Sequence, residues 1–265
     1  VRYRPLRRIG RWGDSAVVPE DEIRDNRPVP SCCVQQSDYR RFFRTNVARR
    51  DARRYRRRGI DRATRRLVDA VKARGLDGAR VLEGGGGIGA IQIELLEAGA
   101  AGAVNVELSS AYEQEAESLL RERGLEGRVE RRLGDFVAAA DSLPRADVVV
   151  LHRAVCCYPD GPAFVAAAAA HSTRLLALTV PRDNVLTRLG ARAINLFLRV
   201  RGCGFRTFVH RMPDLLDAAR AEGLQPVTVE RATLVWQLAV LERAGYDTVS
   251  AERTDRLLRG ERIHR

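Results

Sequence analysis

The sequence predicts an α/β fold in which a mostly parallel sheet has helices on both faces, and two observations lead to this prediction. Between residues 80 and 180, short apolar runs alternate with helical patterns, as in chains built from βαβ units with right-handed crossovers. A run of glycines at residues 84–87 follows the first apolar run, where a strand would pass into a helix. With 265 residues, 45% of them hydrophobic and 30% charged, the chain can bury a full core.

The periodicity predicts seven strands, and helices between most of them. The expected strands cover residues 80–83, 103–107, 128–132, 146–151, 174–180, 226–230 and 233–241. The expected helices cover residues 89–98, 110–123, 135–141, 161–171, 184–201 and 213–222. The last two strands would form a hairpin that adds an antiparallel strand at the C-terminal edge of a Rossmann-like seven-stranded sheet.

Composition divides the chain into four parts. Residues 1–37 contain scattered prolines, glycines and charges, and are expected to be a flexible basic leader. Residues 38–78 predict a helical cap in which Gly59 separates two helices. Residues 79–245 form the main domain, with an insertion at about 183–212, and residues 246–265 form a polar tail.

The net charge of +12 comes entirely from the first quarter of the chain. Residues 1–66 hold 20 arginines and 8 acids, whereas the remaining residues hold 26 basic and 26 acidic residues. Such an extension suits nucleic acid, an anionic membrane face or an acidic substrate, and the alternative is a solvated Arg-rich helix. Lys72 is the only lysine, which is typical of a GC-rich, bacterial genome.

Cysteine usage and hydropathy exclude several classes of protein. Five cysteines, an odd number, argue against a disulfide framework, and the two adjacent pairs lack the spacing of zinc ligands, so no metal is predicted. The longest apolar run, residues 164–170, is too short to cross a membrane. Because no apolar segment follows the basic start, no secretory signal is expected, and we expect reduced thiols in a cytoplasmic protein.

One interpretation of the glycine loop is a dinucleotide-binding site. Gly84, Gly86 and Gly89 match the spacing of the dinucleotide-binding fingerprint, and Glu107 lies at a suitable distance to hold a ribose. A purely structural glycine loop is the other alternative to a nucleotide-type cofactor.

A second pattern in the same loop favours a different cofactor. Glu83, Gly85, Gly87 and Gly89 resemble motif I of the class I S-adenosylmethionine (SAM) methyltransferases, an acidic residue followed by three alternate glycines. A carboxylate here would repel a pyrophosphate, whereas it suits the ammonium and sulfonium of SAM. The alternation also stops after Val180, so no second nucleotide-binding half follows. The resemblance therefore implies SAM as cofactor, S-adenosylhomocysteine (SAH) as product, and cofactor contacts from the loop, including Gly84.

The methyltransferase resemblance continues beyond the loop. It implies that Glu107, at the end of the second strand, accepts hydrogen bonds from the ribose hydroxyls and that Leu108 packs on the adenine. It also implies that Asp135 contacts the adenine amino group and that Phe136 lies against the ring. The alternatives are a solvated Glu107 and an Asp135 that only caps the next helix.

The segment after the fourth strand faces the methyl group and the acceptor in this superfamily. His152 is the candidate general base, because the ordinary pKa of histidine lies near neutrality. It is also a candidate cofactor contact. Arg153 would hold an acidic substrate and Tyr158 would orient the acceptor. The alternatives are a capping or core histidine and a surface ion pair, and Cys156 and Cys157 are expected to be packing residues.

The acceptor is expected to be a small molecule. The loop after the fourth strand lacks the Asn/Asp-Pro-Pro-aromatic sequence of many amino-group methyltransferases that act on DNA, protein or RNA, which favours an oxygen or carbon acceptor. The insertion at about 183–212 would complete the acceptor pocket, with Arg206 and His210 as candidates. The sequence does not indicate an oligomeric state.

Aromatic side chains among the arginines of the cap predict a lid that closes over SAM and acceptor. They are Tyr39, Phe42, Phe43 and Tyr55. The alternatives are an RNA-directed methyltransferase with a nucleic-acid arm and a non-catalytic SAM-binding protein. The order of Phe42-Phe43, Asp51, Tyr55, Gly59, the glycine loop and the Cys-Tyr-Pro-Asp turn resembles the bacterial magnesium-protoporphyrin O-methyltransferase group. The superfamily resemblance covers about residues 38–242.

Overall fold

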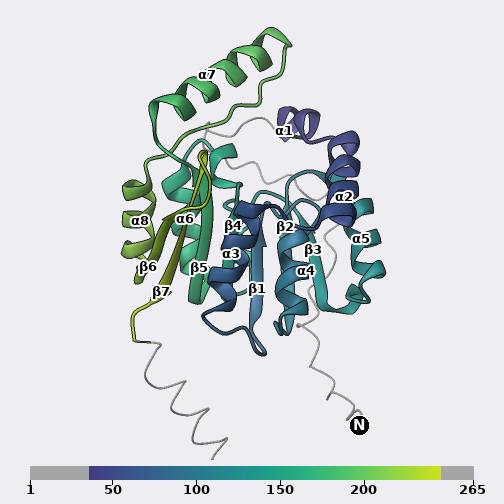
Figure 1. Cartoon of the computed structure of the whole chain (residues 1–265), viewed down its shortest axis with the longest axis vertical. Coiled ribbons are helices and arrows are strands. Elements are labelled where there is room, and N and C mark those ends of the chain that lie inside the picture. The colour runs from purple at the N-terminus through teal and green to yellow at the C-terminus, as the bar shows by residue number, and fades with distance from the viewer. Residues whose placement is uncertain (1–35, 246–265) are drawn as a thin grey trace, which may run out of the picture. The chain divides into compact units, whose positions relative to one another are not determined.

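A single mixed sheet organises the chain in the computed structural model, which describes residues 36–245 (Figure 1). Its seven strands lie in the order β3-β2-β1-β4-β5-β7-β6, and β7 is antiparallel to both of its neighbours. The strands are β1 Arg80–Gly84, β2 Gly102–Glu107, β3 Val129–Leu133, β4 Ala146–His152, β5 Ser172–Pro181, β6 Leu224–Arg231 and β7 Trp236–Arg243. The predicted fold class is confirmed, with the last strand beginning at Trp236 rather than at residue 233.

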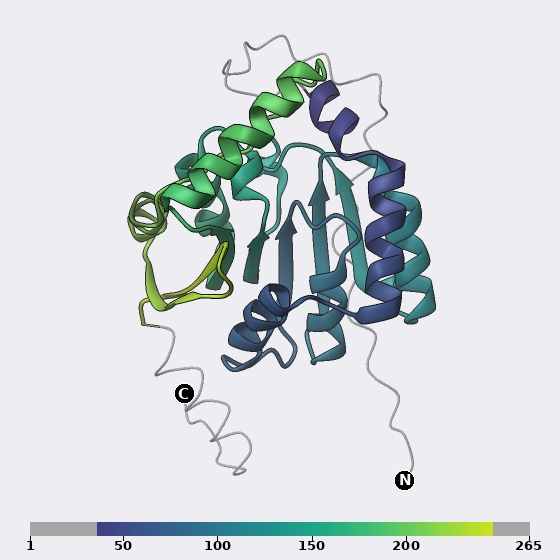
Figure 2. The same ribbon diagram turned by 45° about the horizontal axis from the view of Figure 1, so that its top comes forward.

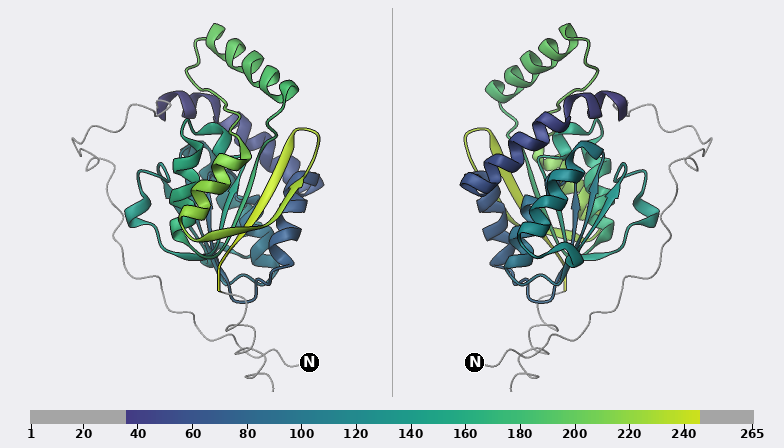
Figure 3. Two further views of the ribbon diagram at one scale, coloured as in Figure 1. Left: turned by 90° about the vertical axis from the view of Figure 1, so that its left-hand side faces the viewer. Right: turned by 90° about the vertical axis from the view of Figure 1, so that its right-hand side faces the viewer.

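Helices cover both faces of the sheet, as the two side views in Figure 3 show. The helices are α1 Gln36–Phe42, α2 Thr45–Arg58, α3 Arg62–Lys72, α4 Ala90–Glu97, α5 Glu113–Glu122, α6 Gly161–His171, α7 Val185–Val200 and α8 Met212–Ala221. Helices α3, α4 and α5 lie on one face, and α6 and α8 lie on the other. Because β4 and β5 are covered on both sides, nearly all their side chains are buried, as in parallel sheets generally.

The prediction of a helix at residues 135–141 is wrong. This segment forms a turn followed by the short 3-10 helix η3, Ala140–Ser142. Asp135 caps the turn by accepting hydrogen bonds from the amides of Val137 and Ala138, at 2.8 and 3.2 Å. Leu143 is already extended, as residues before a proline tend to be, so there is no room for an α-helix.

The cap consists of three helices, and Gly59 separates two of them as predicted. Gly59 ends α2 with a φ of 64°, a conformation that favours glycine. The buried side of α2 carries Ala48, Ala52 and Tyr55, at helical spacing, while its arginines point outward. The Tyr55 hydroxyl donates to Glu94 of α4 at 3.1 Å, and Arg56 pairs with Glu115 and Glu122 of α5. These contacts fix α2 against the domain.

Helix α3 is tied to the sheet through its N-cap. The Asp61 carboxylate accepts a hydrogen bond from the Thr64 amide at 3.0 Å and pairs with the Arg153 guanidinium at 2.9 Å. Arg153 follows β4, and its guanidinium carbon lies 4.7 Å from the ring centroid of Trp236, the first residue of β7. Helix α3, the end of β4 and the start of β7 therefore meet at the Arg153 side chain.

We expect Asp61→Asn to lower the free energy of unfolding at neutral pH by about 1–2 kcal/mol, because asparagine can cap the helix but cannot pair with Arg153. Burial alone would raise the pKa of Asp61, but the Thr64 amide and the Arg153 guanidinium hold it well below its ordinary value. The stabilisation is therefore present above the pKa of an unfolded aspartate and is lost as the pH falls below it. Denaturant unfolding across pH checks this, with the exposed Asp69→Asn as control; equal losses in both variants would contradict it.

Candidate functional site

The glycine loop lies at the carboxyl end of β1, in the centre of the sheet, where open α/β sheets bind their ligands. Gly85, Gly87 and Gly89 have φ values of 69°, 55° and 77°, so the backbone here adopts a conformation that other residues rarely adopt. The Gly85 amide donates to the carbonyl of Val106 in β2 at 2.8 Å. The loop is thereby held flat over the ends of two strands.

A buried carboxyl group lies directly under this loop. Glu83 is 2% exposed, and the Asn105 side-chain amide donates to it at 3.4 Å. Burial raises the pKa of Glu83 to about 8, although Arg131 opposes the shift. A Cβ at Gly86 would lie 1.9 Å from Asn105 Nδ2 and 2.7 Å from the Glu83 carboxyl. The glycine at this position is thus required by the packing beneath it.

The second acidic residue braces the loop from the neighbouring strand. Glu107 is 1% exposed, which rules out the solvated alternative. Its two oxygens accept hydrogen bonds from the amides of Gly87 at 2.9 Å and Ser109 at 2.8 Å. Burial raises the pKa of Glu107 above its ordinary value even with these donors in place.

Arg131 was missed by the sequence reasoning. It lies in β3, donates to the Gly87 carbonyl at 3.0 Å and pairs with Glu113 of α5 at 2.7 Å. It also lowers the pKa values of both Glu83 and Glu107. The one signal in the sequence is an arginine within a predicted strand. Because β3 carries two adjacent arginines, the sequence does not show which of them turns inward and is buried.

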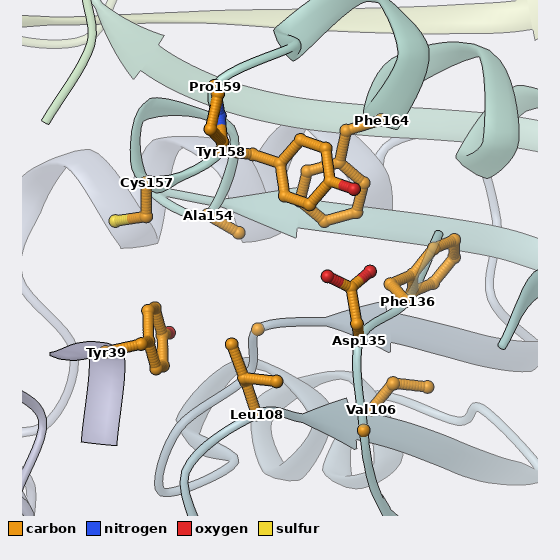
Figure 4. Close-up of a pocket in the computed structure, with 12 residues that line it drawn as sticks. Tyr39, Val106, Leu108, Asp135, Phe136, Ala154, Cys157, Tyr158, Pro159 and Phe164 are labelled. Atoms are coloured by element: carbon orange, nitrogen blue, oxygen red, sulfur yellow. The ribbon is translucent and has the colours of Figure 1, made fainter. Parts of the chain in front are cut away.

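Two hollows adjoin at this end of the sheet. The first is lined by Tyr39, Gly85, Val106, Leu108, Gly134, Asp135, Phe136, Ala154, Cys157, Tyr158, Pro159 and Phe164 (Figure 4). The second lies between the cap and the glycine loop and reaches Glu83, Glu107, His152 and Arg153. Four residues line both hollows: Tyr39, Gly85, Ala154 and Cys157.

The structure brings the predicted adenine contacts together in the first hollow. Leu108 follows β2, and Asp135 and Phe136 follow β3. Figure 4 shows the Asp135 carboxylate pointing into the hollow, toward Tyr158. Asp135 also caps its turn, so both of its expected contacts are compatible. Phe136 is almost fully buried against Phe164, at 5.4 Å between ring centroids.

His152 lines the second hollow at the end of β4. Its Nε2 lies 3.1 Å from the Thr64 hydroxyl, whereas its buried Nδ1 has no hydrogen-bond partner among the described residues. Burial, with a contribution from the neighbouring Arg153, lowers the pKa of His152 to about 3. The near-neutral pKa that motivated the base assignment is therefore not what the structure gives, and the imidazole is neutral at physiological pH.

The other predicted residues after β4 have structural contacts of their own. Arg153 adopts a φ of 56° and pairs with Asp61, as the ion-pair alternative expected. Tyr158 packs against Phe164, at 5.1 Å between centroids, and lines the first hollow. Cys156 is buried and Cys157 is half-buried, with 4.0 Å between their sulfur atoms. The roles of Arg153 and Tyr158 toward an acceptor stay predictions.

The segment after α7 covers the loop after β4. The Phe208 amide donates to the Cys156 carbonyl at 2.7 Å, and His210 Nε2 lies 2.9 Å from the Tyr158 carbonyl. Arg206 donates to the carbonyls of Cys203 and Phe205. Neither Arg206 nor His210 lines the two hollows. His210 contacts the loop after β4, whereas Arg206 donates to carbonyls of its own segment.

An aromatic cluster joins the cap to this segment. Phe205, which the sequence reasoning missed, stacks on Phe42 at 4.5 Å between centroids and meets Tyr39 at 6.0 Å and Phe43 at 5.4 Å. Tyr39 lines both hollows. The expected lid residues therefore lie beside the site, except Tyr55, which faces α4 from the lower part of α2 and still reaches the second hollow.

Comparison with known proteins bears on the fold. No protein-family model and no curated protein matches the sequence. Among solved structures, magnesium protoporphyrin IX methyltransferase (ChlM) from Synechocystis PCC 6803 with bound SAH is similar with a TM-score of 0.59 at 18% identity, over 79% of this chain and 100% of that one. The 1,6-didemethyltoxoflavin-N1-methyltransferase of Burkholderia thailandensis, with its substrate and SAH bound, gives 0.55 at 19% identity over 79% and 87%.

The chain has the fold of the SAM-dependent methyltransferases. The structure of the [4+2]-cyclase SpnF is similar as well, with a TM-score of 0.50 at 16% identity over 67% of this chain and 80% of that one. A methyltransferase fold therefore does not by itself establish a reaction, which has to be argued from the site.

We expect Gly86→Ala to lower the free energy of unfolding by about 1–3 kcal/mol, because the added methyl group collides with Asn105 and Glu83. Gly127→Ala is the matched control, since a Cβ there meets nothing within 4 Å and Gly127 has no positive φ. Chemical denaturation of both variants measures the difference. Equal stabilities would mean that the loop is not packed on its two polar neighbours.

We expect Glu83→Gln to stabilise the ligand-free protein, increasingly so between about pH 4.5 and about pH 8. The folded protein keeps Glu83 protonated over this range while the unfolded chain ionises it, so wild-type stability falls as the pH rises. The variant lacks this loss. Unfolding free energies of both proteins across this range check the prediction, and a constant difference would contradict it.

Proposed function

We propose that the protein is a SAM-dependent methyltransferase that acts on a small-molecule acceptor at an oxygen or carbon atom. The observation that carries the proposal is the pair of buried carboxyl groups, Glu83 and Glu107, beneath a loop that only glycines can form. The pKa values of both carboxyl groups are already raised, and a pyrophosphate beside them would oppose their ionisation further, whereas a cationic ligand favours it.

The residues present fit SAM. Glu107 would hold the ribose hydroxyls, while Leu108, Asp135 and Phe136 would hold the adenine in the first hollow. The methionine part would follow Gly85 and Gly87 toward the second hollow, where the buried Nδ1 of His152 lacks a partner among the described residues. Buried polar atoms without partners are uncommon, so this nitrogen supports a polar ligand group here.

When bound, SAM supplies an electrophilic methyl group on a cationic sulfur. The chain's own contribution is to align the acceptor and to exclude water. Tyr39 and Cys157 line both hollows, and Tyr158 lines the first hollow, so these three side chains surround the place where acceptor and cofactor would meet. An ammonium close to Glu83 would favour the ionised carboxyl group and lower its raised pKa.

His152 suits hydrogen bonding better than proton abstraction. With a pKa of about 3, its imidazole takes up a proton only weakly at neutral pH. Its neutral ring, positioned by the Thr64 hydroxyl, can still accept or donate one hydrogen bond through Nδ1. We therefore assign His152 to the cofactor contact among its two expected roles. An acceptor whose proton is acidic needs no strong base.

A second candidate is an RNA-directed methyltransferase, because the exposed side of α2 carries a shallow surface lined almost wholly by arginines. The lining residues are Asn46, Arg49, Arg50, Arg53, Arg54, Arg57 and Arg58. Several of these arginines have acidic partners, for example Arg54 with Asp61. The small-molecule proposal is preferred because the hollow at the glycine loop is lined mostly by apolar surface.

Calorimetric titration of the full chain with SAM, SAH and NADH tests the cofactor. We expect SAM and SAH to bind, and Glu107→Gln to weaken both by about tenfold or more, since a carboxylate acceptor is stronger than an amide. The exposed Glu117→Gln in α5 is the control and should bind as the wild type does. Binding of NADH alone, or equal SAM affinity in all three proteins, would overturn the proposal.

A further inference from the structure

Helix α7 turns its apolar side toward solvent. At 100° per residue, six large apolar side chains share one arc of the helix, and their exposed fractions range from 54% to 78%. They form what we call the outer face: Val185, Leu186, Leu189, Leu196, Phe197 and Val200. An ordinary surface helix does the reverse and buries such an arc against the core. Figure 2 shows α7 lying across the carboxyl end of the sheet beside α1.

Polar contacts on the inner side hold the helix in this orientation. Asn195 donates to the Thr207 carbonyl and accepts from the Thr207 amide, both at 2.9 Å. Leu198 is buried with Phe205 in the aromatic cluster. At the start of the helix, the Asn184 side chain accepts a hydrogen bond from the Thr187 amide at 3.0 Å and so caps the first turn. Turning the outer face inward would break these contacts, so its exposure is a built feature of the fold.

A second apolar element continues the outer face. Leu234 and Val235, in the turn between β6 and β7, are 78% and 45% exposed. Arg182, just before α7, donates from its backbone amide to the Val235 carbonyl at 2.7 Å and from its side chain to the Leu234 carbonyl at 3.2 Å. The turn and the start of α7 therefore lie side by side, and both present large apolar side chains.

Apart from Asp183, which directly precedes α7 and its N-cap, the charged residues along the outer face are arginines. Residues 184–213 contain six arginines and no acidic residue. Arg188, Arg192 and Arg199 fall on one flank of the outer face, and among them Arg188 pairs with Asp183. An apolar arc flanked by arginines is the pattern of a helix that lies in the surface of an anionic bilayer. Among the described residues, no helix is long and apolar enough to cross a membrane.

We propose that the outer face of α7, together with Leu234 and Val235, docks onto an anionic lipid bilayer. At roughly 1.5 Å per residue, the 16-residue helix is long enough to lie along the interface, with its arginines at the level of the phosphates. A second copy of the chain is the less suitable occupant, because pairing two such faces would bring arginine flanks together without a carboxylate from either segment. Docking would place both hollows at the membrane surface, since the segment after α7 holds the loop after β4.

Flotation of the full chain with lipid vesicles tests the proposal. We expect binding to phosphatidylcholine vesicles that contain phosphatidylglycerol, and weak binding to phosphatidylcholine alone. The double variant Leu186→Glu with Phe197→Glu should lower the partition coefficient by about tenfold or more. Val227→Glu with Val229→Glu is the matched control, because these exposed valines lie on β6, outside the outer face. Arg192→Glu with Arg199→Glu should remove the preference for the anionic lipid.

All three double glutamate variants carry the complete Arg-rich N-terminal part, so any binding by that part is common to them. The melting temperature of each variant shows whether it still folds. The milder pair Leu186→Ser with Phe197→Ser should keep the wild-type melting temperature and still lose vesicle binding. Equal partitioning of the Leu186/Phe197 and Val227/Val229 variants would overturn the proposal, as would no binding by the wild type. A wild-type dimer in light scattering that ignores vesicles and dissociates in the Leu186/Phe197 variant would assign the outer face to a second copy.

Discussion

The burial of two carboxyl groups under the glycine loop is the constraint on which the rest of the site depends. Glu83, the last residue but one of β1, and Glu107, the last residue of the adjacent parallel strand β2, are both buried at the same end of the sheet. The loop backbone packs directly on the side chains of Glu83 and Asn105, which explains why a Cβ at Gly86 has no room. Backbone amides and Arg131 offset part of the electrostatic cost, and the raised pKa values of both carboxyl groups show that the compensation is incomplete.

Incomplete compensation has a functional consequence. A floor that is destabilised when empty gains more from a ligand that carries positive charge, because that ligand supplies what the protein leaves out. The same reasoning explains a further polar atom at the second hollow. Nδ1 of His152 is buried and lacks a partner among the described residues, which costs stability unless a ligand meets it. Groups that weaken the ligand-free domain therefore line the place where the proposed cofactor would bind.

Most of the architecture could be predicted because local pattern and global fold agree. Buried β4 and β5 read as continuous apolar runs, and the strand–glycine–helix order places the loop at the carboxyl end of β1. The prediction failed at residues 135–141, where a proline and a capping aspartate outweigh a short apolar pattern. It also missed Arg131 and Phe205, because their roles depend on partners distant in sequence, Gly87 and the aromatic residues of α1. The pKa of His152 likewise depends on burial, which a single residue type does not reveal.

Helix α7 shows a different limit of sequence reasoning. Its periodicity predicts an amphipathic helix, and the usual assumption would place the apolar arc against the core. One pair of hydrogen bonds, between Asn195 and the backbone of Thr207, selects the opposite orientation. The same return segment packs Phe205 against the cap and fastens Phe208 to the loop after β4. The segment that fixes the exposed apolar face therefore also packs against the residues around the first hollow. A surface bound at α7 would thus contact, through this segment, the place where the acceptor would enter.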